Sequence, residues 1–404
     1  MKRILFIYLH LITFFTFSQS FNENRVKANH GDPEAQFLLG KHYAEGISSV
    51  KNDSLAIYWF NKSADQENAY GQNGLGVCYE KGIGIPISYT LAFNWYKKSA
   101  EQGYKSAQYN MGRCYEYGHG VLKDSIKTIY WFEKSADQGD DFAQNSLADC
   151  YYFGIVATLD YFRAYYLYKQ SAKKGNVIAQ NSLGDCYYFG KGVSKDLTKA
   201  AYWYEKSAIK GNSDAQYNLG EAYFFGDGVV KDYNKAAELY EKSAKQGNSD
   251  AQYNIGYCYS YGDGVSKDYS KSIYWIQKSS DQGNLDAQNL LGDTYYYGNG
   301  VPINHIKAVF WYQLSADGGN NESQFNLGFS YYNGQGVTQD YSQSVIWFEK
   351  SAEQGNSDAQ YYLGHCYYYG KGIPVNYGKA LIWMLEADKS GSKDAHKFLR
   401  KSNL

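Results

Sequence analysis

Six cysteines and seven histidines are the residues of this 404-residue chain best suited to redox chemistry or metal binding. Cysteine pairs form disulfides in exported proteins, and cysteine together with histidine forms zinc sites. In this chain, however, every cysteine occupies the same position of an internal repeat. The cysteines are Cys78, Cys114, Cys150, Cys186, Cys258 and Cys366.

This shared position predicts free thiols rather than disulfides. Neighbouring helices pack about 8–10 Å apart, whereas a disulfide requires Cα atoms within about 7 Å of each other. Repeats without cysteine have Ala222, Thr294, Ser330 or His42 at this position, so it mostly takes a small residue. Because a buried cysteine behaves as a small apolar residue, we expect six buried thiols that bind no metal.

No other motif in the sequence predicts catalysis. The histidines form no HExxH spacing, and no G-x-S-x-G motif occurs. The segments GDGV, GKGV and GNGV resemble phosphate-binding loops, but they recur in nearly every repeat and follow predicted helices, whereas a phosphate loop follows a strand. Most recurrent acidic residues fit helix-capping positions. We therefore expect a protein that is not an enzyme, with no metal and no cofactor.

The first 20 residues predict a signal peptide. MKR is positively charged, ILFIYLHLITFFTF is apolar over 14 residues, and small residues precede a cleavage position after Ser20. An uncleaved membrane anchor is the alternative, but a spanning helix requires about 20 apolar residues. We expect a secreted or periplasmic protein with no stable membrane insertion after cleavage. A net charge of −1 argues against nucleic acid as a partner.

A 36-residue period governs the rest of the chain. We number the repeat from the alanine of its AQ dipeptide, which is position 0 and first occurs at Ala35. Ten complete repeats then fill residues 35–394 without an insertion. Tyrosine is at position 8 and glycine at position 11 in all ten repeats, and all eight tryptophans are at position 24. Such a period is typical of a solenoid.

Each repeat is predicted to form two amphipathic helices. Positions 0, 4, 5, 7 and 8 give the first helix one apolar or small face, and positions 21, 24, 25 and 29 give the second helix another. Serine or asparagine caps the first helix, glycine at position 11 ends it, and aspartate at position 17 caps the second. Glycine at position 5 allows the helices to approach closely, and the tryptophans and the tyrosines at position 8 are the expected large core residues. Because neither helix buries its face alone, the sequence predicts an all-α solenoid of stacked antiparallel pairs.

The pattern AQxxLGxxYxxGxGVxxDxxKAxxWxxKSAxQG resembles the Sel-one-like repeat, which is related to the tetratricopeptide repeat. The resemblance implies a right-handed α-solenoid of ten 36-residue repeats, in which the first helix of each pair lines the concave face. It also implies a scaffold for protein complexes. Residues 21–34 then form an N-terminal half-repeat cap and residues 395–404 a C-terminal capping helix. Some relatives bridge two cysteines within one repeat, and this chain departs from that pattern.

Positions 2, 3, 6, 9 and 10 of the first helix are expected to face the groove of such a solenoid. From the fourth repeat onward, positions 9 and 10 are mostly aromatic, position 6 is often acidic and position 3 is often asparagine. The predicted ligand-binding residues are Asp149, Tyr152, Phe153, Asp185, Tyr188, Phe189, Asn218, Glu221, Phe224, Phe225, Asn254, Tyr257, Tyr261, Asp293, Tyr296 and Tyr297.

This groove predicts a protein or peptide partner. Exposed aromatic side chains commonly mark binding sites, and asparagine amides can bond both the N–H and the C=O of an extended peptide. The acidic residues favour a neutral or basic ligand. A glycan or peptidoglycan is the alternative, because tyrosines flanked by aspartate and asparagine also suit sugar rings. Two arrangements are open for the rings at position 10: they face the groove or they pack between repeats.

Overall fold

The computed structural model describes residues 21–46 and 50–402. The predicted signal peptide, residues 1–20, lies outside the described residues. Tertiary contacts divide the chain into two units. Unit 1 ends at Trp203 and unit 2 begins at Tyr204, and each unit is described by itself.

Helix pairs fill both units, and the described residues contain no strand. Unit 1 holds a helical segment at residues 21–29, followed by α2 (Pro33–Glu45), α3 (Asp53–Ala64), α4 (Ala69–Lys81), α5 (Tyr89–Glu101), α6 (Lys105–Tyr117), α7 (Ser125–Asp137), α8 (Asp141–Phe153), α9 (Tyr161–Lys174) and α10 (Val177–Phe189). Unit 2 holds α12 (Ser213–Phe225), α13 (Tyr233–Lys245), α14 (Ser249–Tyr261), α15 (Tyr269–Ser280), α16 (Leu285–Tyr297), α17 (His305–Asp317), α18 (Asn321–Asn333), α19 (Tyr341–Glu353), α20 (Ser357–Tyr369), α21 (Tyr377–Lys389) and α22 (Lys393–Ser402). The boundary falls within α11 (Leu197–Ala208).

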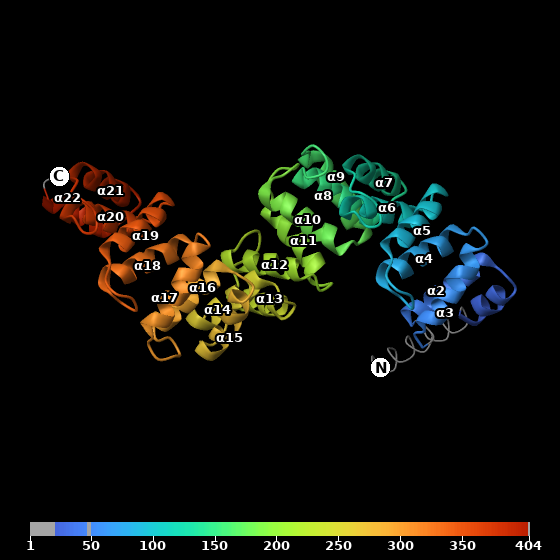
Figure 1. Ribbon diagram of the computed structural model, residues 1–404, viewed down its shortest axis with the longest axis horizontal. Helices are drawn as coiled ribbons and strands as arrows, with labels where there is room; N and C mark the ends of the chain where they lie inside the picture. The colour runs from blue at the N-terminus through green and yellow to red at the C-terminus, as the bar shows by residue number, and fades with distance from the viewer. Residues whose placement is uncertain (1–20, 47–49, 403–404) are drawn as a thin grey trace. The chain divides into compact units, whose positions relative to one another are not determined.

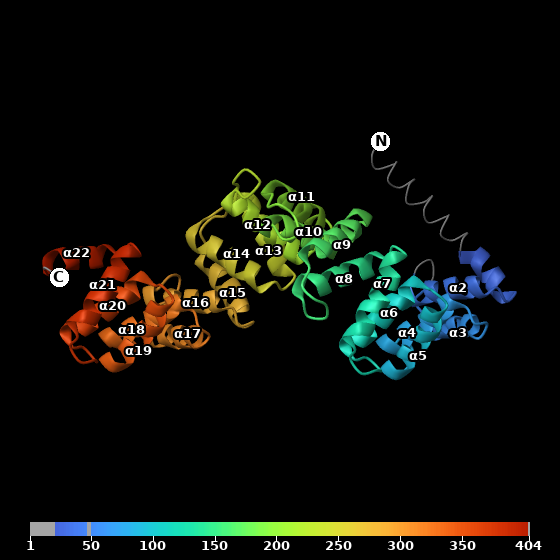
Figure 2. The same cartoon turned by 90° about the horizontal axis from the view of Figure 1, so that it is seen from above.

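Even-numbered helices are the first helices of their repeats. From α2 to α8 in unit 1 and from α12 to α20 in unit 2, each packs against the odd-numbered helix that follows it. This pairing is visible along unit 1 in Figure 1 and along unit 2 in Figure 2. The fold confirms the predicted all-α solenoid of helix pairs.

The helix boundaries follow the predicted capping residues. Asn212 caps α12 by accepting a 2.7 Å hydrogen bond from the backbone N–H of Ala215. Gly226 ends the same helix with φ 85°, a left-handed conformation that suits glycine. Asp232 caps α13 by accepting a 3.1 Å bond from the N–H of Lys235. A polar residue therefore caps the start of each helix, and a glycine ends the first helix before the second begins.

The largest fully buried side chains lie at position 25 of the repeat, not at position 24. They include Tyr96, Phe132, Tyr168, Tyr240, Tyr312 and Phe348. Six tryptophans are only half-buried, so the prediction that the tryptophans are large core residues holds for Trp275 and Trp347 alone. Five of the tyrosines at position 8 are buried, as predicted. Adjacent helical residues point about 100° apart, and only position 25 points at the first helix of its own repeat. Trp131 packs instead against a buried cluster that combines Tyr96 of the preceding repeat with Met111 and Tyr115 of its own.

Glycine at position 5 makes room for this buried ring. A Cβ atom on Gly220 would lie 2.7 Å from the ring of Tyr240, and one on Gly292 would lie 2.3 Å from the ring of Tyr312. Both distances are shorter than a carbon–carbon contact allows. The predicted close approach of the two helices is confirmed.

Buried polar side chains join consecutive helices in a recurring pattern that the sequence reasoning did not anticipate. The Ser243 hydroxyl donates to the carbonyl of Ser213 at 2.7 Å. The Gln246 amide donates to the Gln216 side chain at 2.8 Å, and Gln216 donates to the carbonyl of Ala208 at 3.2 Å. The same bonds recur in other repeats. They explain why the serine of KSA occurs in nine repeats and the glutamine of AQ in all ten.

All six cysteines are buried free thiols, as predicted. Burial raises the pKa of each thiol to about 12. Thr294 and Ser330 occupy the same position in other repeats, and each hydroxyl donates to the carbonyl one turn earlier, at 2.7 and 2.8 Å. The position therefore holds small side chains that leave no polar group unbonded.

Candidate functional site

The aromatic residues at position 10 project from the first helices into solvent. Phe153 and Phe189 in unit 1 are each 60% exposed, and Phe225, Tyr261 and Tyr297 in unit 2 are 61%, 58% and 65% exposed. These values argue against packing between repeats, which was one of the two arrangements left open. Large rings this exposed in successive repeats form an unusual apolar surface.

The aromatic residues at position 9 are half-buried beneath them. The ring of Phe224 contacts Tyr233 edge-on, with a centroid distance of 4.9 Å. In unit 1, the Lys191 ammonium lies 4.9 Å from the ring centre of Tyr152, and Lys195 lies 5.5 Å from that of Tyr188. The rings at positions 9 and 10 of one repeat also contact each other edge-on, with centroid distances of 5.0 Å for Tyr152 and Phe153 and 5.1 Å for Phe224 and Phe225.

The acidic residues at position 6 accept hydrogen bonds from the buried tyrosines at position 25. Asp149 accepts a 2.5 Å bond from the Tyr168 hydroxyl, and Glu221 accepts one from Tyr240. Asp293 forms the same bond with Tyr312 at 2.7 Å. A buried tyrosine hydroxyl requires an acceptor. One oxygen of each carboxylate is thus bonded inside the repeat, a role that the prediction of ligand binding did not include.

The sequence shows the same association between an acidic residue at position 6 and a tyrosine at position 25. An acidic residue stands at position 6 in four repeats, and in all four position 25 is tyrosine. Repeats with Phe, Ile or Met at position 25 have Lys41, Arg113, Tyr257, Phe329 or His365 at position 6. In the remaining repeat, Tyr96 instead donates a 2.7 Å bond to Glu80, at position 9.

Burial makes these carboxyl groups weaker acids. It raises the pKa of Asp149 and of Asp293 to about 6, against the opposing effect of the tyrosine hydrogen bonds. It also raises the pKa of Glu221. Desolvation of the charged form is the main cause in all three cases.

The asparagines at position 3 link neighbouring first helices. Asn254 on α14 donates a 2.7 Å hydrogen bond to Glu221 on α12. Asn326 on α18 donates a 3.2 Å bond to Asn289 on α16. Asn218 lies half-buried on α12. The bonded amide N–H groups hold adjacent repeats together, a role that the sequence reasoning did not assign to them.

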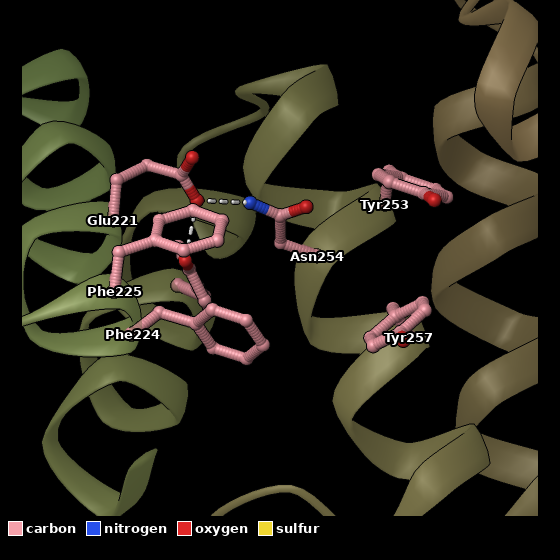
Figure 3. Close-up of a pocket in the computed structure, with 7 residues that line it drawn as sticks. Glu221, Phe224, Phe225, Tyr253, Asn254 and Tyr257 are labelled. Carbon is pink, nitrogen blue, oxygen red and sulfur yellow. Dashed lines mark hydrogen bonds between the residues drawn. The ribbon is translucent and has the colours of Figure 1, made fainter. Parts of the chain in front are cut away.

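Five predicted residues meet in one pocket of about 300 Å³ in unit 2, here named the Phe225 pocket. Its walls come from α12, α13 and α14 (Figure 3). The lining residues are Glu221, Phe224, Phe225, Tyr240, Tyr253, Asn254 and Tyr257. In Figure 3 the rings of Phe224 and Phe225 lie on one side, and those of Tyr253 and Tyr257 on the other.

The same pocket recurs 72 residues later, with a volume of about 260 Å³. Six residues that line this Tyr297 pocket occupy the same repeat positions as residues of the Phe225 pocket, although their types can differ. They are Tyr296, Tyr297, Tyr312, Phe325, Asn326 and Phe329. Asp358, Tyr362 and Asp394 also line it. The sequence reasoning missed Tyr240, Phe325 and Phe329, which a comparison of repeats two periods apart would have found.

The other predicted residues lie outside these two pockets. Asp149, Tyr152 and Phe153 are on α8, and Asp185, Tyr188 and Phe189 are on α10. On α10, the positions that correspond to Tyr253 and Tyr257 hold Asn181 and Asp185, so no aromatic wall stands opposite Tyr152 and Phe153. Tyr261 stands beside the Phe225 pocket, with its ring centre 4.4 Å from that of Tyr257.

Within residues 21–46 and 50–402, no cluster of three histidine, cysteine, aspartate or glutamate side chains is arranged to hold a metal ion. None of the helices in that part of the chain has the length and hydropathy of a membrane span.

A model of the Sel1 repeat matches ten consecutive segments of the chain, residues 33–68, 69–104, 105–140, 141–176, 177–212, 213–248, 249–284, 285–320, 321–356 and 357–391. Of two similar crystal structures, c5321, a protective antigen of uropathogenic Escherichia coli with an SLR fold, is 35% identical over 94% of this chain and 91% of its own, with a TM-score of 0.64. A Sel1 repeat protein from Oxalobacter formigenes is 29% identical over 78% of this chain and 93% of its own, with a TM-score of 0.58. A sel1-like repeat-containing protein of Acanthamoeba polyphaga mimivirus is 51% identical over 47 residues, which are 12% of this chain and 8% of the viral protein. The chain belongs to the Sel1 repeat family.

Proposed function

We propose that this protein is a non-catalytic scaffold that binds a segment of a partner protein on the first helices of unit 2. The observation that carries the proposal is the Phe225 pocket, in which four aromatic rings, an asparagine and a carboxylate surround an open space. Solenoids of this family are commonly protein-interaction scaffolds. Concave apolar sites with a few polar groups are the usual form of a binding site.

A protein segment suits both the chemistry and the layout of this surface. Aromatic residues in pockets dominate binding energy at protein interfaces. The Phe225 and Tyr297 pockets recur along one face, so a chain that lies across the first helices meets equivalent contacts in turn. Asn254 binds Glu221 through its N–H, and its amide oxygen points away from Glu221 (Figure 3), where it can accept a bond from a peptide N–H.

A glycan is the second candidate. Its support is the pair Tyr257 and Tyr261, whose rings lie 4.4 Å apart between centres and 34° from parallel. Tyr261 is 58% exposed, so its ring, supported by Tyr257, offers an apolar surface on which a sugar ring can stack.

Site-specific photo-cross-linking tests the proposal directly. Benzoylphenylalanine at Phe225 should cross-link a partner protein in extracts of the source organism, whereas the same group at Phe153 should not. The two positions are matched, because they occupy the same repeat position and are 61% and 60% exposed. Equal labelling from both positions, or none from Phe225, would contradict the proposal. Binding of the unmodified protein to purified peptidoglycan, with no protein cross-linked, would favour the glycan.

We propose that the protein acts after export, either outside the cell or in the periplasm. The support is the predicted signal peptide and the similarity to c5321, which is a protective antigen. N-terminal sequencing of the protein from its source should give Phe21 as the first residue. A chain that begins at Met1 would contradict cleavage.

A further inference from the structure

The Phe225 and Tyr297 pockets share an aromatic wall of the same composition. In the Phe225 pocket, α12 contributes two phenylalanines and α14 contributes Tyr253 and Tyr257. In the Tyr297 pocket, the equivalent rings come from α16 and α18. Aromatic faces carry negative potential, and a cation within about 6 Å of a ring centre is attracted to it. Four rings around one space therefore form a potential cage for a cation.

Both pockets are also acidic. Glu221 lines the Phe225 pocket, and Asp358 and Asp394 line the Tyr297 pocket. Burial, together with the negative charges of Asp286 and Glu322, raises the pKa of Tyr253 in the pocket wall. An anion would meet repulsion in either pocket. A neutral apolar group would fit but would leave the carboxylates unused.

The chain does not supply its own cation to either pocket. Within the residues that the structure describes, no lysine, arginine or histidine forms an ion pair with Glu221, Asp293, Asp358 or Asp394. No lysine or arginine in that part of the chain lies over the rings of Phe225, Tyr257 or Tyr297.

Elsewhere in the chain, lysines cover comparable rings. Lys371 lies 4.5 Å from the ring centre of Tyr332 and donates a 2.6 Å hydrogen bond to its hydroxyl. Lys267 lies 4.6 Å from the ring centre of Tyr269. The two pockets are thus acidic aromatic sites whose cation must come from outside the chain.

We infer that the Phe225 and Tyr297 pockets are twin cages for basic side chains, and that the partner segment carries two lysines or arginines that enter them together. This inference rests on the proposed function. First helices of adjacent repeats pack about 8–10 Å apart, so pockets two repeats apart are roughly 20 Å apart. An extended chain advances about 3.3 Å per residue. The two basic residues should therefore be separated by roughly six positions.

Fluorescence anisotropy with defined peptides tests the inference on the full protein. The probe is a fluorescein-labelled Gly/Ser peptide with two lysines six positions apart. The matched probe replaces both lysines with norleucine, which keeps the apolar stem and removes the charge. The dilysine peptide should bind at least about tenfold more tightly. Equal affinity for the two peptides, or no measurable binding of the dilysine peptide, would overturn the inference.

Charge-removing variants assign the effect to the pockets. Glu221→Gln and Asp358→Asn should each reduce the preference for lysine, because each removes the charge of a carboxylate that lines one of the pockets. Glu221→Gln also keeps an acceptor for the hydroxyl of Tyr240. Asp149→Asn is the matched control, because Asp149 bonds Tyr168 in the same way but lies in unit 1, outside both pockets. Loss of lysine preference in the control as well would overturn the assignment to the pockets. A partner cross-linked from Phe225, combined with equal peptide affinities, would sustain the proposed function and reject the cages.

Discussion

The hydroxyl of Tyr312 donates a 2.7 Å hydrogen bond to Asp293, and Tyr312 also lines the Tyr297 pocket. One side chain thus fills the core of its repeat and fixes a carboxylate beside the proposed binding surface. A double-mutant cycle of Tyr312→Phe and Asp293→Ala should give a coupling free energy of about 1–2 kcal/mol in urea unfolding. Additive effects of the two substitutions would show that the bond contributes nothing to stability.

Asp149 should make the stability of the protein depend on pH. Burial raises its pKa from 3.8 to about 6 in the folded state, so the folded protein binds this proton more tightly than the unfolded chain. The stability from this group is present at low pH and is lost as the pH rises through about 6. Lowering the pH from 7 to 5 should stabilise the wild type by about 1 kcal/mol relative to Asp149→Asn. Identical pH dependence of the two unfolding free energies would contradict the assignment.

Glu67 stores backbone strain. It has φ 58° and occupies position 32 of its repeat, where the corresponding residue of the next repeat is Gly103 with φ 90°. A side chain disfavours this conformation by about 1–2 kcal/mol. Glu67→Gly should therefore raise the free energy of unfolding by about 1 kcal/mol. Glu67→Ala keeps the Cβ atom and should give no comparable gain. Equal stabilisation by both variants would point to the lost charge instead.

The cysteines should react only after unfolding. All six are buried thiols, and their pKa values are raised to about 12. A thiol reagent at pH 8 should label almost none in the native protein and six after denaturation without reductant. Fewer than six after denaturation would indicate disulfides.

The repeat period predicted the fold because it is a property of sequence alone. Glycine at position 11 and the polar caps recur at fixed spacing, so the helix boundaries were also predictable. Which of two adjacent apolar positions faces the partner helix depends on how the pair is rotated, and periodicity does not specify that. The roles of positions 24 and 25 were misassigned for this reason.

The candidate site was predictable only in part. Exposure of Phe225 and Tyr261 followed from their place off the apolar stripe. The bond between Glu221 and Tyr240 joins residues 19 positions apart on two helices, so treating position 6 in isolation missed this internal bond of a carboxylate that also lines the pocket. Comparison of positions 6 and 25 across the repeats contains that information.

The most direct test of the central claim is the affinity of the partner segment identified by cross-linking for three forms of the protein. Phe225→Ala combined with Tyr257→Ala removes two rings of the Phe225 pocket and should weaken binding by at least about tenfold, as expected for aromatic residues at the centre of an interface. Phe153→Ala, at an equally exposed position of unit 1, should bind like the wild type. Equal affinity of all three forms, measured by calorimetry with unchanged thermal unfolding, would contradict the claim that this pocket binds the partner.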